Sequence, residues 1–532
     1  MQLYRAFATV GGLTMVSRLL GFVRDILIAA ALGTGAVADA FFVAFRFPNL
    51  FRRLFGEGAF NSAFVPLFAK RLEGEGEAAA RSFAEDAMAL LGSALIVFSI
   101  AAIVLMPWLM MLLAPGFVVA PQKYDLAVLL TQIAFPYLFC LSIVALLSGV
   151  LNSMHRYWAA AAAPILLNVV LIAAISFAIW AGFSRQPEAG FILAVGVTVA
   201  GIAQLLMLYI AVRAAGMSLR PRLPRYTDDM KRLVALGIPG LVSGGVTQIN
   251  IVVGTIIASL QAGAVSYLYY ADRLYQLPLG IVGVAVGVVL LPELARKLRA
   301  GDRSAVIDAQ NRSLEFAMLL TLPAAVGLAV AAEPLVRVLF ERGAFGGHDT
   351  PATAWALAAF AAGLPSFVMI KVFQPAFFAR EDTRTPMTFA IQNMVINVAG
   401  SIALFFLFQE LGLWPHVGIA LATTIAGWIN AWMLWRTLRR SGAFEWDDRL
   451  RRNLVRILAA STVMAVAVAV ATPMLARYTL VGHGLLVQVL ALVGIVGAGV
   501  LAYAGLVLAL GVIDKAQLDR FFRRRRASGS GG

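Results

Sequence analysis

Long runs of apolar residues alternate with short polar or charged stretches along the whole chain. A helix needs about 20 mostly apolar residues to cross a bilayer, because backbone groups left unsatisfied in lipid are too unfavourable. Fourteen runs meet that requirement, and no polar stretch between them is long enough for a soluble domain. The predicted spans are residues 7–32, 36–68, 84–114, 124–151, 157–182, 190–212, 233–260, 267–295, 313–340, 352–379, 385–409, 415–435, 453–475 and 483–511.

Composition agrees with a membrane protein. Of the 532 residues, 61% are hydrophobic and 13% are charged, whereas about a quarter are charged in soluble domains, so an ordinary water-soluble enzyme is excluded. The single cysteine, Cys140, cannot form an internal disulfide, and the four histidines lack the paired spacing of a metal centre. The sequence contains no phosphate-binding G-x-x-x-x-G-K-S/T loop. We therefore predict no enzyme activity, no metal and no cofactor.

The distribution of cations predicts the orientation. The formal net charge is +15, and 31 of the 43 lysines and arginines fall on one side of the fourteen-span topology, against five on the other. The positive-inside rule therefore places both termini in the cytoplasm, with basic loops facing anionic headgroups of the membrane lipids. The Arg523–Arg526 run fits this side, so no nucleic-acid partner is predicted. Charges within the first apolar run argue against a cleaved signal peptide.

Landmarks that recur at a nearly constant offset predict an internal repeat. Pro66 is matched by Pro292, Pro107 by Pro334, Pro136 by Pro365 and Asn168 by Asn397, and the separation is nearly the same in all four pairs. An offset of six spans makes the halves parallel repeats, a design that commonly works by alternating access. The predicted fold is an all-α polytopic membrane protein with two six-helix lobes and two extra C-terminal helices. The predicted domains are residues 1–215 and 216–440 (the lobes), 441–512 (spans 13 and 14), and 513–532, a basic cytoplasmic tail that ends in what resembles a cloning remnant.

Seven cations remain inside predicted spans, namely Arg18, Arg24, Arg46, Arg52, Arg53, Arg273 and Lys371. Each would be unfavourable by at least ~2.5–3.5 kcal/mol at the bilayer centre, so such residues normally face a cavity or a partner. A seven-residue step returns to nearly the same helix face, which puts Arg18 on one stripe with Asp25, and Ser17 on a neighbouring stripe with Arg24.

On the second span one face within about 80° would hold Asp39, Arg46, Asn49, Arg53 and Glu57. The run of 36–68 would be about 50 Å long if straight, which exceeds the bilayer core. Pro48 and the glycines at 56 and 58 make a bend easy. We therefore expect a bent helix that lines a cavity.

Two interpretations of these charges stay open. They can be internal ion pairs, Arg18–Asp25, Arg53–Glu57 and Asp272–Arg273, and Arg46 or Arg52 can reach the headgroups. The nearby acids are fewer than the arginines, however, which favours a cationic cavity for an anion. Arginine suits phosphate because its planar fork binds two oxygens and stays charged. The candidate binding residues are Arg18, Arg24, Arg52, Arg273, Asp25, Arg53, Asp39 and Glu57.

Two motifs in the first spans and one at span 8 resemble the MurJ lipid II flippase family. They are Ser17-Arg-Leu-Leu-Gly-Phe-Val-Arg-Asp25, then Asp39-Ala-Phe-Phe-Val-Ala-Phe-Arg-Phe-Pro-Asn-Leu-Phe-Arg-Arg-Leu-Phe-Gly-Glu57 with Gly-Ala-Phe, and Tyr269-Tyr-Ala-Asp-Arg-Leu-Tyr-Gln-Leu-Pro278. The resemblance implies the fold of the multidrug/oligosaccharidyl-lipid/polysaccharide exporter superfamily. It also implies transfer of undecaprenyl-pyrophosphate-linked disaccharide pentapeptide from the cytoplasmic to the periplasmic leaflet of the bacterial inner membrane.

The resemblance further implies that Arg18, Arg24, Arg52 and Arg273 are cavity arginines, with Asp25 nearby, and that the last two helices hold the polyprenyl tail. Lipid II, membrane lipids and cell-wall synthesis proteins are the implied partners. Some relatives have a sodium site with a carboxylate on span 11, where this chain has Asn397. Asn393 and Asn397, with Thr423 and Thr424, could offer oxygens to sodium, but interhelical hydrogen bonds are the favoured interpretation.

Other functions are kept as alternatives. A flippase for another polyprenyl-linked saccharide is the nearest, because pyrophosphate recognition says nothing about the sugar. A multidrug cation exporter would need unpaired acids in its cavity, and an anion channel would not need the lobe duplication. Without ATP hydrolysis, transport would be driven by an ion gradient, the membrane potential or consumption of the substrate, since one charge crossing 100 mV is worth about 2.3 kcal/mol.

Overall fold

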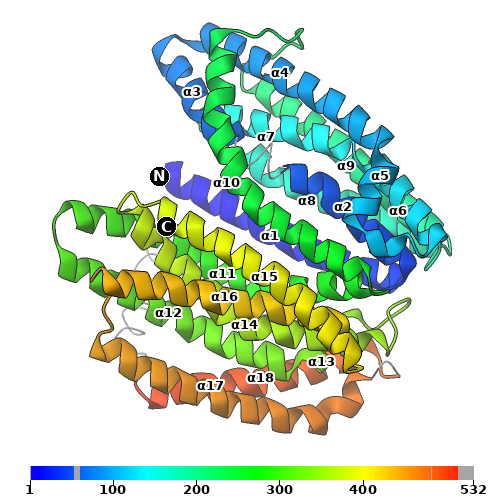
Figure 1. Ribbon diagram of the computed structural model, residues 1–532, viewed down its shortest axis with the longest axis vertical. Helices are drawn as coiled ribbons and strands as arrows, with labels where there is room; N and C mark the ends of the chain where they lie inside the picture. The colour runs from blue at the N-terminus through cyan, green and yellow to red at the C-terminus, as the bar shows by residue number, and fades with distance from the viewer. Residues whose placement is uncertain (1, 53–59, 481, 513–532) are drawn as a thin grey trace, which may run out of the picture. The chain divides into compact units, whose positions relative to one another are not determined.

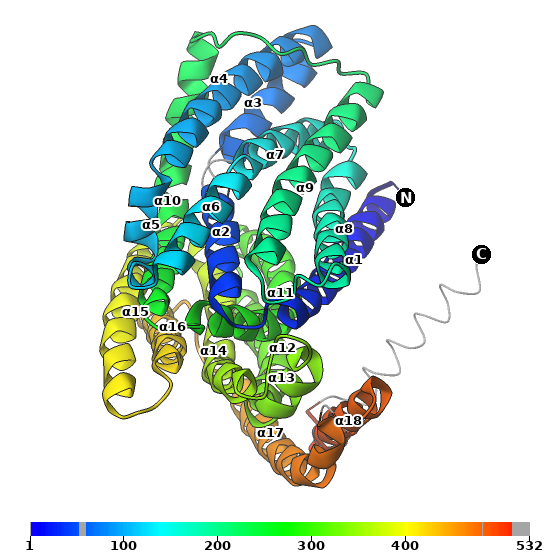
Figure 2. The ribbon, with the colours of Figure 1, turned by 90° about the vertical axis from the view of Figure 1, so that its right-hand side faces the viewer.

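The computed structural model describes residues 2–52, 60–480 and 482–512. In this part of the chain the regular structure is α-helix, with two short 3-10 turns, and the chain forms two compact units (Figures 1 and 2). Unit 1 comprises Met1–Tyr269 and Arg342–Gly346, and unit 2 comprises Tyr270–Glu341 and Gly347–Gly532. The predicted lobes are defined by the sequence repeat, whereas these two units are defined by packing. The units do not test the lobe boundaries, which stay predictions.

The described part of unit 1 contains ten helices and the beginning of an eleventh. They are α1 (Gln2–Leu32), α2 (Ala36–Arg52), α3 (Asn61–Gly74), α4 (Glu77–Val104), α5 (Met106–Leu113), α6 (Pro121–Ala134), α7 (Tyr137–Ser153), α8 (Trp158–Trp180), α9 (Pro187–Ala214) and α10 (Asp228–Ser259), with the 3-10 turn η2 (Pro115–Phe117). In Figure 2, α1, α8 and α9 lie side by side, and these three helices are in contact. Helix α1 therefore packs along the face of unit 1 that α8 provides.

Helix α11 (Ala264–Arg299) begins in unit 1 and continues into unit 2. The remaining helices of unit 2 are α12 (Arg303–Val330), α13 (Ala332–Phe340), α14 (Asp349–Phe378), α15 (Arg384–Glu410), α16 (Pro415–Arg440), α17 (Asp448–Leu475) and α18 (Leu485–Ala509), with the 3-10 turn η3 (Ala476–Thr479). Figure 1 shows α17 and α18 side by side, and both contact α12.

The predicted spans coincide with helices, and three of them are divided in two. Span 84–114 consists of α4 and α5, span 124–151 of α6 and α7, and span 313–340 of α12 and α13. A proline lies at each division, because proline lacks an N–H and cannot continue the hydrogen-bond ladder of the preceding helix. Pro107 is in the first turn of α5, Pro136 directly precedes α7, and Pro334 is in the first turn of α13.

Ten segments of the described chain are long and apolar enough to cross a membrane, and they match predicted spans 3–6 and 9–14. The other four predicted spans coincide with α1, α2 with α3, α10, and α11. The total of fourteen is compatible with these helices and stays a prediction. Of the residues expected to bend span 36–68, Pro48 lies inside α2, and the glycines at 56 and 58 lie outside the described residues.

Equivalent helices of the two halves pack through equivalent residues. Gly201 on α9 lies so close to the Tyr137 ring of α7 that an added Cβ would be 2.7 Å from it, and Gly427 on α16 is related in the same way to Phe367 of α14, at 2.6 Å. The separation of Gly201 from Gly427 along the chain equals that of the first pair of proline landmarks. Small residues that admit close backbone approach are the usual basis of helix association in membranes. This agreement supports the internal repeat.

Each half also contains a buried glutamate that contacts the chain beyond its sixth predicted span. Glu85 on α4 is 1% exposed, accepts a hydrogen bond from the backbone N–H of Arg220 at 2.9 Å, and pairs with the Arg222 guanidinium. Glu315 on α12 accepts from Asn453 at 2.7 Å and pairs with Arg449 at 3.3 Å. The two glutamates are separated by nearly the same offset as the landmarks of the repeat, so the same contact recurs in both halves.

We expect the Glu315→Ala variant to unfold more easily than the parent protein. The substitution leaves Asn453 and the partly exposed Arg449 without their acceptor, and a buried group that loses its partner destabilises by about 1–3 kcal/mol. The measurement is the thermal midpoint of the purified protein in detergent. Glu410→Ala, which removes an exposed glutamate from the end of α15, is the matched control, and equal midpoints for the two variants would contradict the assignment.

Candidate functional site

Arg24 and Asp25 form a buried ion pair on α1. Arg24 is 5% exposed and Asp25 is 2% exposed. The Asp25 carboxylate oxygen Oδ1 accepts from Arg24 Nη2 at 2.7 Å and from Nε at 3.0 Å, and the Tyr269 hydroxyl lies 3.2 Å from the same oxygen. A charge inside a membrane segment is tolerated when it is paired. The Arg24 charge is therefore compensated within its own helix.

Asn168 of α8 connects Arg24 to the preceding turns of α1. Its side-chain oxygen accepts from Arg24 Nη1 at 2.9 Å, and its amide nitrogen donates to the backbone carbonyl of Ser17 at 2.9 Å. Ser17 and Arg24, two helical turns apart, thus share a partner, which confirms that these two residues lie on one stripe of α1. The amide holds the guanidinium in place from the side opposite Asp25, so both ends of the arginine fork are engaged.

The Arg18–Asp25 ion pair of the first interpretation is not formed, because Asp25 pairs with Arg24. Seven residues of helix rise by about 10.5 Å, so a shared stripe does not bring these two side chains as close as the neighbouring Arg24 already is. Arg18 is instead exposed. Arg18 and Asp25 thus differ in their surroundings, one exposed and the other buried.

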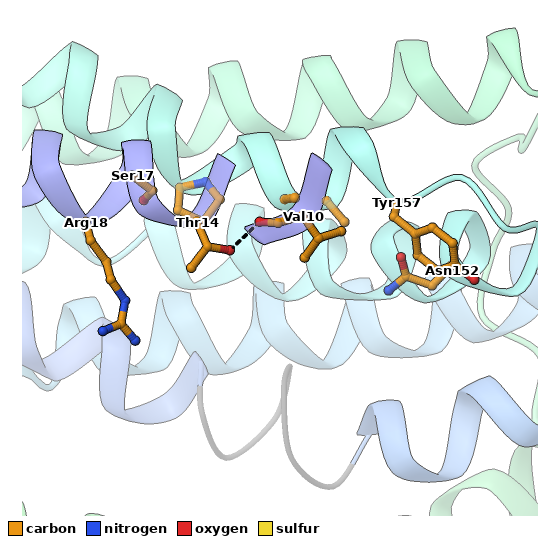
Figure 3. A pocket seen from close by; sticks show the side chains of 9 residues that line it. Val10, Thr14, Ser17, Arg18, Asn152 and Tyr157 are labelled. Atoms are coloured by element: carbon orange, nitrogen blue, oxygen red, sulfur yellow. Dashed lines mark hydrogen bonds between the residues drawn. The ribbon is translucent and has the colours of Figure 1, made fainter. Parts of the chain in front are cut away.

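Arg18 lines an open pocket of about 490 Å³ on unit 1. Figure 3 shows Arg18 and Ser17 at one end of the pocket, Asn152 and Tyr157 at the other, and Thr14 with Val10 between them. The remaining lining residues are Ala160, Ala161 and Pro164 of α8. The pocket thus combines one exposed guanidinium, several neutral polar side chains and an apolar wall. Such a combination is typical of sites for small organic ligands.

Tyr269, near the start of α11, joins three helices of unit 1. Its ring stacks on Phe42 of α2 with centroids 3.8 Å apart, and its hydroxyl reaches Asp25 of α1. The Arg46 guanidinium lies 5.6 Å from the centre of the same ring, within the range of a cation–π contact. Arg46 also donates to the Thr255 hydroxyl at 3.4 Å. Arg46, a cation with no assigned role in the sequence, therefore packs between α2, α10 and α11.

Asp39 is fully buried and serves as the cap of α11. Its carboxylate accepts from the backbone N–H groups of Gly263 at 2.9 Å and Ser266 at 3.0 Å, and from the Ser266 hydroxyl at 2.6 Å. Lys123 of α6 completes the arrangement with an ion pair of 2.6 Å to the second carboxylate oxygen. A helix needs an acceptor for its first N–H groups, and Gly263 has no side chain to provide one. Asp39 supplies that acceptor from α2.

The comparisons with known proteins identify the family. A family model described as lipid II flippase MurJ matches residues 28–508. The chain belongs to the MurJ lipid II flippase family. A probable lipid II flippase MurJ from Rhizobium meliloti (strain 1021) is 46% identical over 534 aligned residues, which cover 100% of this chain and 98% of the relative. The lipid II flippase MurJ of Burkholderia cenocepacia is 35% identical, over 87% of this chain and 89% of the relative.

Solved structures agree with this family. A lipid II flippase MurJ in the inward closed conformation has a TM-score of 0.74 and 26% identity, and the match covers 93% of this chain and 97% of that structure. An inward-facing multidrug transporter of the MATE family has a TM-score of 0.63 at 16% identity, over 82% of this chain and 98% of that structure, which shows a shared fold alone. The chain is therefore a polytopic, all-α membrane protein of a transporter family.

The structure places the other predicted site residues in different ways. Arg273 lies on the part of α11 that belongs to unit 2 and is half-buried, and Lys371 on α14 is exposed. Arg52 is the last residue of α2, and its side chain lies outside the described part of the chain, as do Arg53 and Glu57 entirely. A single site that combines Arg18, Arg24, Arg52 and Arg273 thus stays a prediction.

Of the four polar residues considered as a sodium site, Asn397, Thr423 and Thr424 form hydrogen bonds between and within helices, whereas the buried Asn393 Oδ1 has no hydrogen-bond partner in the described part of the chain. The Thr423 hydroxyl of α16 donates to the Asn397 side-chain oxygen of α15 at 3.2 Å, and Ser401 approaches the same oxygen at 3.4 Å. Thr424 donates to the carbonyl of Ala359 on α14 at 2.7 Å. These bonds agree with the interhelical interpretation of the residues.

Two residues of the buried networks were not recognised as such in the sequence. In the sequence Asn168 is a landmark of the repeat, and nothing along the chain marks Lys123 as the partner of a buried acid. Lys123 is in fact the third residue of α6, with a side chain only 10% exposed. The usable signal was Asp39, an acid in an apolar span with too few cations near it in the sequence.

Proposed function

We propose that this chain moves lipid II, an undecaprenyl-pyrophosphate-linked disaccharide pentapeptide, from the cytoplasmic to the periplasmic leaflet of the bacterial inner membrane. The observation that carries the proposal is Arg18, an exposed arginine lining an open pocket in a membrane protein of the MurJ lipid II flippase family. Both termini lie in the cytoplasm, as the excess of basic residues in the loops of that side indicates.

The arginines divide into two groups by their surroundings. Arg18 is open to a ligand, whereas Arg24 is engaged by Asp25 and Asn168. In our proposal Arg18 makes the first contact with the pyrophosphate, because its planar fork matches two phosphate oxygens. Arg24, Arg52 and Arg273 join the contact as the lobes close around the head group in an alternating-access cycle.

The polyprenyl tail stays in the bilayer beside α17 and α18. These helices pack against each other and against α12, and they expose apolar side chains to the surroundings, among them Val466, Val470, Leu490 and Val493. An apolar surface of this kind suits an isoprenoid chain, whereas the head group requires the polar pocket. The substrate therefore occupies two environments at once, and only its head has to cross the membrane interior.

The driving force in this proposal is an ion gradient, the membrane potential or consumption of the product. The contribution of the membrane potential depends on the net charge carried across the membrane and is about 2.3 kcal/mol for each charge and each 100 mV. Cell-wall synthesis proteins on the periplasmic side are the partners that would consume lipid II, and this consumption would drive transport in the outward direction.

A flippase for another polyprenyl-linked saccharide is the second candidate, because an arginine that recognises pyrophosphate does not distinguish the attached sugar. A multidrug exporter is less favoured. The likeness to MATE transporters concerns the fold, and the pocket presents a cation, Arg18, where a cationic drug would need an acid.

The test is growth of a bacterium in which the native lipid II flippase is depleted. We expect this chain to sustain growth, and the Arg18→Ala variant to lose the rescue while it reaches the membrane in the same amount. Arg18→Lys keeps the charge without the fork and should rescue partially. Arg213→Ala, which removes an exposed arginine at the end of α9, should rescue fully. Absence of rescue by the well-expressed parent chain would refute the assignment to lipid II.

A further inference from the structure

The end of the pocket away from Arg18 is formed by the turn between α7 and α8. Asn152 near the end of α7 and Tyr157 directly before α8 both line the pocket, and Figure 3 shows them at the end opposite Arg18. Asn152 and Tyr157 take no part in the contacts described for Arg24 and Asp25, whose partners are Asn168 and Tyr269. Asn152 and Tyr157 can therefore contact a part of the transported head group other than the part that the arginines bind.

The turn holds Tyr157 in a defined position. His155 has a φ of +58°, its N–H donates to the Asn152 carbonyl at 3.0 Å, and the Arg156 N–H donates to the Leu151 carbonyl at 2.9 Å. This is the left-handed residue that closes many helices. The imidazole Nδ1 of His155 then forms a 3.1 Å hydrogen bond with the Tyr157 hydroxyl. With its hydroxyl anchored, the tyrosine presents its ring at the pocket with little loss of side-chain freedom.

The lining chemistry matches a sugar ring better than the other parts of the substrate. A tyrosine face is electron-rich and attracts the C–H bonds of a pyranose face, while the Asn152 amide and the hydroxyls of Thr14 and Ser17 can exchange hydrogen bonds with ring substituents. A polyprenyl chain has no use for these polar groups. A peptide would require a charged or backbone partner along its length, and Arg18 is the one charged residue among the described lining residues.

We propose that this pocket is a saccharide subsite, in which Tyr157 and Asn152 bind the sugar next to the pyrophosphate that Arg18 holds. The inference rests on the proposed function and adds to it a recognition element for the sugar. Val10 and Arg18 lie at opposite ends of about 12 Å of helix α1, which leaves room for a phosphate group and a sugar in sequence. A volume of about 490 Å³ is that of a small-ligand site, so the pocket takes one part of the head group.

The experiment measures binding of three lipids to the purified full-length protein in detergent, with the parent chain and variants compared. The lipids are lipid II, the same lipid without its peptide, and undecaprenyl pyrophosphate without any sugar. We expect Tyr157→Ala to weaken binding of both sugar-bearing lipids about tenfold, the size expected for loss of an aromatic contact, and to change binding of undecaprenyl pyrophosphate by less than twofold. Arg18→Ala should weaken all three.

Two further variants keep the outcome interpretable. Tyr157→Phe retains the ring and should keep most of the preference for sugar-bearing lipids, and Trp158→Ala removes a neighbouring exposed aromatic side chain that does not line the pocket. Equal weakening of all three lipids by Tyr157→Ala, or no change in any of them, would overturn the subsite, as would an effect that appears only when the peptide is present. If the parent chain binds the disaccharide lipids of another pathway and not lipid II, the proposed function fails while the subsite stands.

Discussion

Replacing Asp39 with alanine is expected to produce the largest loss of stability of any single substitution in unit 1. The carboxylate is fully buried and is held by the Lys123 ammonium, two backbone N–H groups and the Ser266 hydroxyl. Removing one member of a buried ion pair destabilises by about 3–5 kcal/mol, because the other charge stays buried without compensation. The start of α11 loses its acceptor in the same step.

The measurement is thermal unfolding of the purified variants, combined in a double-mutant cycle. Lys123→Met should be milder than Asp39→Ala, since the carboxylate keeps the three donors of the Gly263–Ser266 segment. The double variant Asp39→Asn with Lys123→Met should be more stable than the summed losses of the Asp39→Asn and Lys123→Met single variants predict, because neither charge is then left alone. Asp125→Ala, which removes an exposed acid close to Lys123 in the sequence, should leave the midpoint unchanged. A midpoint of Asp39→Ala equal to this control would contradict the capping role.

The helices were predictable from the sequence because an apolar run long enough for the bilayer has few alternatives to a helix. The prolines are only partly informative. Pro107, Pro136 and Pro334 lie where predicted single spans divide into pairs of helices, as the missing N–H of proline favours, but Pro365, the counterpart of Pro136, lies inside the continuous helix α14. Local rules therefore account for the element order and not for which prolines end a helix.

Contacts between distant helices could not be predicted in the same way. The face shared by Ser17 and Arg24 follows from helical periodicity, and the structure confirms it through Asn168. Lys123, in contrast, lies 84 residues from its partner Asp39, and no pattern along the chain reports that the two meet. The main partners of Asp39 are backbone N–H groups, which every residue other than proline has. When a side chain binds backbone groups, no particular residue type is required as its partner, so the sequence does not reveal where the partner lies.

Arg24 provides the second large effect, and the test separates its role in the fold from its role in transport. Arg24→Ala removes the guanidinium that lies 2.7 Å from the buried Asp25 carboxylate and the donor to the Asn168 oxygen. We expect a loss of about 3–5 kcal/mol, measured as a lower thermal midpoint and a lower yield of folded protein in the membrane. Asp25→Asn should also be destabilising, since Arg24 then loses the carboxylate charge at 2.7 Å.

The double variant Arg24→Gln with Asp25→Asn removes both charges and keeps groups that hydrogen-bond. Neutralising a buried pair as a whole is often nearly neutral for stability, in contrast to removing one partner, so the double variant should recover most of the midpoint lost by either single variant. Growth rescue should not recover with it, because in the proposed cycle the Arg24 guanidinium also contacts the pyrophosphate. Arg18→Ala is the complementary control, with a normal midpoint and lost rescue. Full rescue by the stable double variant would show that Arg24 serves the fold only and would leave the phosphate contact to Arg18 and the remaining arginines.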